Sequence, residues 1–142
     1  MIYLIGSLRN PKIPIIGNRL RHEGFRVWDD WFAGGKVADD EWKSYEEGLG
    51  HNYLEALQGD AAQHVYHFDK THLDMCDTGV LICPAGKSGH LELGYMLGSG
   101  KKGYILLDTS AIRWDVMYLF AHNVCQDITE LIRQLHRGSY HE

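Results

Sequence analysis

The chain has no hydrophobic run long enough to cross a membrane and no run of basic residues. Its apolar stretches fall well short of the roughly 20 residues that a transmembrane helix needs. The first residues lack the basic segment that opens a signal peptide. The formal net charge of −5 argues against a surface for a nucleic acid polymer. We therefore expect a cytoplasmic protein with neither a membrane nor a nucleic acid polymer as partner.

Cysteine and proline are also scarce, with three residues of each in the chain. Three cysteines make an odd count, and two of them lie in or beside apolar segments, so we expect reduced, buried thiols rather than a disulfide framework. The nine histidines come without a cysteine or carboxylate motif of zinc-site spacing, which makes a metal site unexpected. A chain of 142 residues, 44% of them hydrophobic, fits a single domain spanning residues 1–142.

Short apolar runs alternate with helical patterns along the chain. The runs predict strands at 2–5, 25–28, 79–83, 104–107 and 124–125. The helical patterns cover 15–23, 40–58, 61–76, 90–98, 115–122 and 127–136. This alternation predicts an α/β fold, a three-layer sandwich around a flavodoxin-like or Rossmann-like parallel sheet of about five strands. The irregular segment 29–43, with its tryptophans and phenylalanine, is either a binding loop or a cover for the edge of the sheet.

Two turns that follow predicted strands carry residues suited to binding a ligand. In open parallel sheets, ligands bind outside the carboxyl ends of the strands. After the first strand comes Gly6, which tolerates backbone angles that other residues avoid, followed by Ser7 and Arg9, which are able to bind an anion. After the third strand comes a turn rich in small residues, which includes Gly86, Ser88 and Gly89.

Two carboxylates are candidates for catalysis. At about 100° per residue, Asp69 falls near the middle of an apolar helical stripe, where burial would raise its pKa and suit it to act as a general acid. Glu92 follows the turn at 84–89, where the helix dipole would keep it ionised and able to act as a nucleophile. The alternatives are that Asp69 ties down a loop and that Glu92 only complements the helix dipole. Within about 60° of Asp69 on the wheel lie Ala62, Val65, Tyr66, Leu73 and Cys76.

Three segments together resemble the nucleoside 2-deoxyribosyltransferase family, which includes the 2′-deoxynucleoside 5′-monophosphate N-glycosidases. They are Tyr-Leu-Ile-Gly-Ser-Leu-Arg at 3–9, Asp69 eight residues before Asp77, and Gly86 followed by Glu-Leu-Gly-Tyr at 92–95. The resemblance spans residues 2 to about 107. It implies cleavage of the N-glycosidic bond of a 2′-deoxynucleoside, with transfer of the deoxyribosyl group to another base or to water.

The resemblance also implies a role for each matching residue. Glu92 matches the nucleophile that forms a glutamyl-deoxyribosyl intermediate, Asp69 matches the acid that assists the leaving base, and Tyr3 matches the tyrosine that orients the glutamate. The loop that binds the 5′-phosphate is matched by Ser7, Leu8 and Arg9, with Gly6 before them, and Ser88 is a further phosphate candidate. The family uses no metal or other cofactor and often completes its site with a neighbouring subunit, which implies a homodimer or a higher homo-oligomer.

The chain also departs from the family's nucleoside transferases. Gly86 stands where they carry an acidic residue, and Ser88 stands where they carry a glycine. The missing acidic residue, together with Arg9 and Lys87, favours a 5′-monophosphate as the substrate. Two alternatives stay open: a hydrolase of a ribonucleotide or dinucleotide, and a non-catalytic sensor that binds an intact nucleotide.

Overall fold

Five parallel strands form the centre of the computed structural model, which describes residues 1–108 and 113–139. Neighbouring strands pair in parallel throughout, in the order β2-β1-β3-β4-β5. The predicted parallel sheet of about five strands is therefore confirmed. The strands are β1 (Ile2–Ile5), β2 (Val27–Trp28), β3 (Thr78–Ile82), β4 (Lys102–Leu106) and β5 (Asn123–Cys125).

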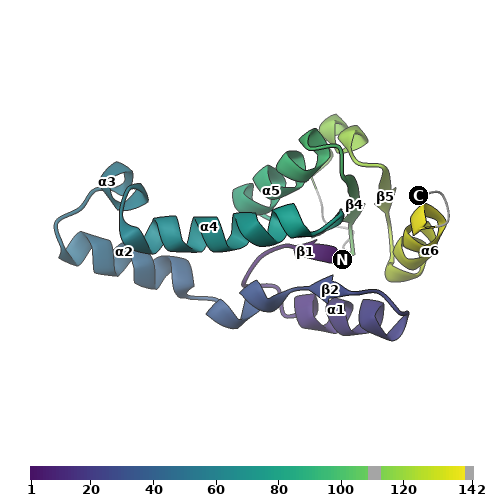
Figure 1. Cartoon of the computed structure of the whole chain (residues 1–142), viewed down its shortest axis with the longest axis horizontal. Coiled ribbons are helices and arrows are strands. Elements are labelled where there is room, and N and C mark those ends of the chain that lie inside the picture. The colour runs from purple at the N-terminus through teal and green to yellow at the C-terminus, as the bar shows by residue number, and fades with distance from the viewer. Residues whose placement is uncertain (109–112, 140–142) are drawn as a thin grey trace.

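Helices cover both faces of this sheet, which confirms the three-layer α/β architecture (Figure 1). On one face lie α1 (Lys12–His22) and α6 (Ile128–Ser139); on the other lie α4 (Asp60–Met75) and α5 (Lys87–Gly98). The remaining elements are α2 (Ala38–Gly48), α3 (Tyr53–Leu57) and the 3₁₀ helices η1 (Asp30–Gly34) and η2 (Val116–Phe120).

The strands read as continuous apolar runs because both faces of the sheet are buried. Successive side chains alternate between the two faces. Leu4 and Val80 thus pack in the cluster under α1 and α6. Tyr3 and Leu81 pack in the cluster under α4 and α5. This alternation places the ring of Tyr3 in the same layer as the two helices that carry Asp69 and Glu92.

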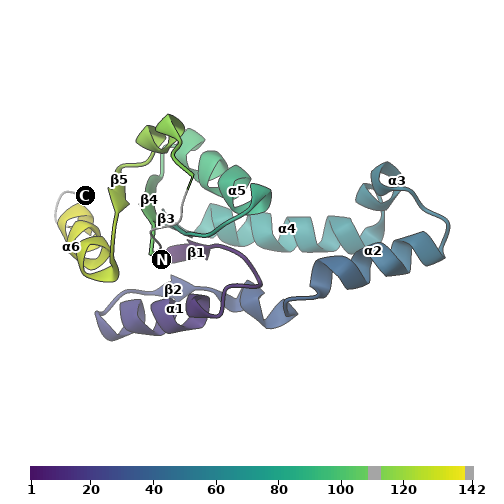
Figure 2. The ribbon, with the colours of Figure 1, turned by 180° about the vertical axis from the view of Figure 1, so that it is seen from behind.

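A helical arm projects from the sheet and consists of α2, α3 and the first half of α4 (Figures 1 and 2). The apolar stripe predicted on α4 is therefore buried only near its end. Leu73 and Cys76 are 5% and 1% exposed, whereas Val65 and Tyr66 are 58% and 57% exposed. Helical periodicity identified the stripe correctly, but the sheet is too narrow to cover its whole length.

The helix predicted over 40–58 is two helices, α2 and α3, with a turn between them. Gly50 adopts a φ of 81° in this turn, a left-handed conformation that favours glycine. Asn52 then starts α3 with a capping box, because its side chain accepts from the backbone N–H of Glu55 while the Glu55 carboxylate accepts from the Asn52 N–H. The turn at Gly50 therefore follows the end of α2, and Asn52 begins α3.

Other helices also have bounds that differ from the predicted ones. α1 begins at Lys12, and Pro14 fits within its first turn, where a missing N–H costs no hydrogen bond. α5 begins at Lys87 rather than at His90. The segment predicted as a helix over 115–122 contains only the 3₁₀ helix η2, which Asp115 caps by accepting from the N–H of Met117.

The irregular segment 29–43 divides into two parts. Trp31 and Phe32 pack against the core, and the indole Nε1 of Trp31 donates to the carbonyl of Leu4 at 2.7 Å. These residues cover the sheet beside its edge strand β2. Trp42 lies instead in the arm, where its ring meets Tyr53 edge-on at 6.4 Å.

All three cysteines are buried and unpaired, as predicted. Within residues 1–108 and 113–139, no helix is both long and apolar enough to span a lipid bilayer.

Candidate active site

Tyr3, Asp69 and Glu92 come together from three separate elements. β1 supplies Tyr3, α4 supplies Asp69 and α5 supplies Glu92. The Tyr3 hydroxyl hydrogen-bonds to the Glu92 carboxylate, and Asp69 is close enough for its charge to repel that of Glu92. The elements are held in register by a shared buried cluster, to which Tyr3, Leu73 of α4 and Leu93 of α5 all belong.

The pKa of Glu92 is raised from its ordinary value of 4.5 to about 7. Burial is the largest cause, repulsion from Asp69 adds to it, and the hydrogen bond from Tyr3 opposes both. This corrects the expectation that the helix dipole keeps Glu92 fully ionised. Because α5 begins at Lys87, Glu92 is its sixth residue, beyond the first turn in which the dipole acts strongly.

The pKa of Asp69 is also raised, because the carboxyl group is partly buried. His72, three residues later on α4, opposes this shift electrostatically. The His72 ring stacks on Trp28 at 4.0 Å, and its Nδ1 lies 2.8 Å from the carbonyl of Phe68. We did not predict a role for His72, although residues three apart on a helix are neighbours and this spacing was a usable signal.

Tyr3 is only 1% exposed, and burial together with both carboxylates raises the pKa of its phenol far above the usual value. The phenol therefore stays protonated and donates its hydrogen bond. Two interacting carboxylates with raised pKa values lose their protons in two steps that belong to the pair. Between those steps the pair holds one carboxylate and one carboxylic acid. A carboxylate is able to act as a nucleophile, and a carboxylic acid is able to protonate a leaving group.

A cavity of about 350 Å³ lies between the turns that follow β1 and β3. Ser7, Arg9 and Gly86 line it, so three of the predicted binding residues meet at the carboxyl edge of the sheet. Asn10 also lines the cavity and was not predicted. Its Oδ1 accepts from the N–H of Lys12 at 3.0 Å, and its buried Nδ2 has no partner among the described residues. An Asn-Pro pair before a helix is a recognisable start signal, and it could have drawn attention to this position.

The other predicted binding residues do not line this cavity. A Cβ on Gly6 would lie 2.7 Å from Cδ1 of Ile13, and one on Gly89 would lie 3.0 Å from Cδ1 of Leu81. Both glycines therefore let a helix pack closely on the sheet. Leu8 is partly buried beside the turn after β1, and Ser88 is exposed in the first turn of α5.

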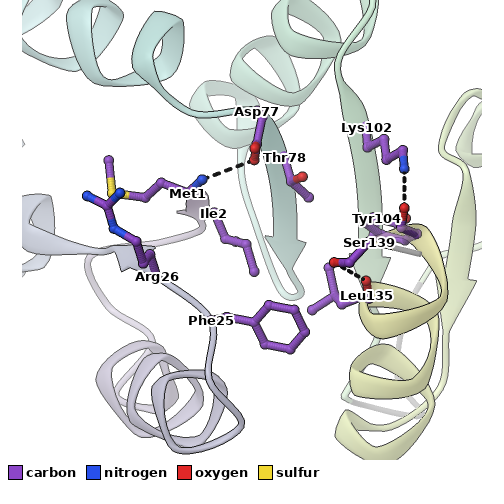
Figure 3. Close-up of a pocket in the computed structure, with 11 residues that line it drawn as sticks. Met1, Ile2, Phe25, Arg26, Asp77, Thr78, Lys102, Tyr104, Leu135 and Ser139 are labelled. Atoms are coloured by element: carbon purple, nitrogen blue, oxygen red, sulfur yellow. Dashed lines mark hydrogen bonds and ion pairs between the residues drawn. The ribbon is translucent and has the colours of Figure 1, made fainter. Parts of the chain in front are cut away.

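A second cavity, of about 110 Å³, lies at the opposite, amino-terminal edge of the sheet (Figure 3). The ammonium group of Met1 bonds to Asp77 there at 3.1 Å, and Lys102 Nζ donates to the carbonyl of Gly138 at 2.7 Å. It is too small for a nucleotide, and neither Asp69 nor Glu92 lines it. In the described part of the chain, no three His, Cys, Asp or Glu side chains are grouped to hold a metal ion.

No model of a known protein family matches the chain, and no curated protein matches it. The fold and site define a single-domain α/β protein with an all-parallel five-stranded sheet and flanking helices. On its α4–α5 face this protein carries a carboxylate pair next to a buried tyrosine.

Proposed function

We propose that this protein belongs to the nucleoside 2-deoxyribosyltransferase family and cleaves the N-glycosidic bond of a 2′-deoxynucleoside, with the 5′-monophosphate as its favoured substrate. The observation that supports this most strongly is the meeting of Tyr3, Asp69 and Glu92. Their raised pKa values are typical of sites that need one nucleophile and one acid at neutral pH. The partner is thus a small-molecule nucleotide, and the reaction needs no cofactor.

In the ligand-free protein the charge of Asp69 favours the shared proton on Glu92. In the proposed reaction this proton lies on Asp69 once the substrate is bound, and the ionised carboxylate of Glu92 attacks C1′ of the deoxyribose. The C1′–N bond breaks, its electron pair stays on the base, and Asp69 supplies the proton that the departing base takes up. Water or a second base then attacks C1′ and releases the Glu92 carboxylate, with Asp69 taking the proton of the attacking group. A deoxyribose lacks the 2′-hydroxyl that would oppose positive charge at C1′, so one nucleophile and one acid suffice.

The cavity between the two turns supports a phosphorylated substrate. Arg9 supplies a guanidinium group and Ser7 a hydroxyl group, and α5 begins directly after Gly86, so its first N–H groups face this region. Gly86 and Glu92 are six residues apart, about 9 Å along the axis of α5. That span is comparable with a sugar and its 5′-phosphate, which would place C1′ near the carboxylate pair.

The arm supports the proposal that the protein forms a homodimer or a higher homo-oligomer. Large apolar side chains lie exposed along it, which a monomer in water would leave uncovered. A second copy of the chain would bury them against its own arm. These side chains are Tyr45, Leu49, Tyr53, Leu54, Val65 and Tyr66, with exposures between 55% and 71%.

Chromatography of the free base tests the proposed function. The protein is incubated with a panel of deoxynucleosides, their 5′-monophosphates and the matching ribonucleotides, with and without a second base. We expect release from the deoxynucleoside monophosphates that Glu92→Gln abolishes while the circular dichroism spectrum is unchanged. Preference for ribonucleotides or dinucleotides would indicate the alternative hydrolase, and tight binding without any base release would indicate a sensor.

A further inference from the structure

Arg9 makes an ion pair that links the cavity to the arm. Its Nη2 donates to Oδ2 of Asp40 at 3.0 Å, and the two side chains are 66% and 68% exposed. Arg9 lies in the turn after β1, whereas Asp40 lies in the first turn of α2, 31 residues later. Of the described residues that line the cavity, Arg9 alone carries a charge. Asp40 therefore holds the guanidinium group that an anionic ligand in this cavity would need.

The ion pair is of a kind that a phosphate can replace. Exposed ion pairs of this type change an equilibrium constant by about fivefold at most. A phosphate group near neutral pH carries a charge between −1.5 and −2, roughly, and binds a guanidinium group through two parallel hydrogen bonds. Asp40 offers one negative charge and a single hydrogen bond. A phosphate in the cavity thus has the stronger attraction for Arg9, while a ligand without a charge has none.

We propose that Asp40 competes with the phosphate group of the substrate for Arg9: it occupies Arg9 in the ligand-free protein and is displaced when the phosphate group binds. The inference rests on the proposed function only in placing that phosphate beside Arg9. A nucleoside lacks the group that displaces Asp40, so its binding leaves the ion pair in place. A nucleotide displaces Asp40 from Arg9, and this breaks the contact between the cavity and the first turn of α2.

Titration with inorganic phosphate, followed by the backbone amide resonances of Ser7 and Gly86 in ¹⁵N NMR, tests the exchange without requiring catalysis. Asp40→Asn removes the competing charge. Asp39→Asn is the matched control, because it removes the same charge from the same helical turn, and Arg9 is bonded to Asp40 rather than to Asp39. We expect the phosphate dissociation constant of Asp40→Asn to be about two- to fivefold lower than that of Asp39→Asn. In an Arg9→Gln background the two variants should bind phosphate equally.

Three results would overturn the inference: equal phosphate affinity of the two variants with Arg9 intact, weaker binding by Asp40→Asn, or no response of the two amides in the unaltered protein. Weaker binding would mean that Asp40 orients Arg9 in the bound state. The outcome is separable from that of the proposed function. Base release combined with equal affinities refutes only the exchange, whereas the expected affinities without base release refute only the glycosidic reaction.

Discussion

Replacing Tyr3 with phenylalanine removes one hydroxyl group from the carboxylate pair. The ring that packs against Trp28, with centroids 5.0 Å apart, is retained. The hydroxyl favours the ionised form of Glu92, because its hydrogen bond opposes the burial and the repulsion that raise the pKa of Glu92 to about 7. Without the hydroxyl, this pKa rises further. The nucleophilic carboxylate then forms only at higher pH.

The size of the effect follows from the strength of the lost bond. A hydrogen bond to a charged group contributes about 1.5–3 kcal/mol, and about 1.4 kcal/mol corresponds to one pH unit. We therefore expect the acidic limb of the pH–rate profile to move upward by about one to two units. For a shift of one unit, the ionised fraction of Glu92 at pH 7 falls from about one half to about one tenth, and activity falls about fivefold.

The assay is kcat/KM for base release between pH 5 and pH 10. Tyr3→Phe should lose activity at pH 7 and regain part of it as the pH rises, up to the basic limb on which Asp69 loses its proton. The control is Tyr95→Phe, which removes a hydroxyl bonded to Asp74 on the outer side of α4 and should leave the profile unchanged. A uniform loss at every pH, with the acidic limb in its original place, would refute the argument that Tyr3 acts through the ionisation of Glu92.

Three further predictions concern the carboxylate pair and the arm. Protonated Glu92 stabilises the fold below its ordinary pKa of 4.5, and this contribution is lost as the pH rises through about 7. Glu92→Gln should therefore raise the free energy of unfolding, measured by urea denaturation, by about 3 kcal/mol at pH 8 and by little at pH 4. Asp69→Asn should slow base release most for poor leaving groups, whereas equal slowing across leaving groups, or the same result for Asp74→Asn, would contradict its acid role. Leu54→Asp and Tyr66→Asp should convert an oligomer to monomers in sedimentation velocity, and a monomeric unaltered protein would disprove the proposed assembly.

The sheet and the convergence at its carboxyl edge could be predicted from the sequence because both depend on local patterns. Runs such as Ile2–Ile5 have no polar residue, which marks a strand buried on both faces. Turns that follow parallel strands lie at one edge, so Arg9 and Gly86 could be assigned to that edge from the sequence. Their shared cavity depends in addition on the order of the strands.

The arm and the protonation of the site could not be predicted in the same way. Periodicity shows which face of α4 is apolar, but the part of that face that is buried depends on how far the sheet extends. Leu73 lies over the sheet and is buried, whereas Val65 lies in the arm and is exposed. The pKa of Glu92 depends on burial and on Asp69, which is 23 positions away in the sequence. The predicted start of α5 lay three residues too late. This error placed Glu92 in the first helical turn, where the helix dipole would keep its carboxylate ionised.

The position of the cavity follows from the order of the strands. After β1 the chain moves outward through α1 to β2, and it then crosses to β3 on the other side of β1. α1 packs on one face of the sheet and α5 on the other, so the turns after β1 and β3 part from each other. Open parallel sheets bind ligands at such a reversal. Because β1 and β3 are paired neighbours, the same reversal sets Tyr3 of β1 beside the helix that carries Glu92. A substrate anchored in the cavity would therefore extend along α5 toward the carboxylate pair. Inserting one helical turn into α5 before Glu92 would increase the distance between the cavity and the pair. We expect this insertion to abolish catalysis while leaving phosphate binding intact.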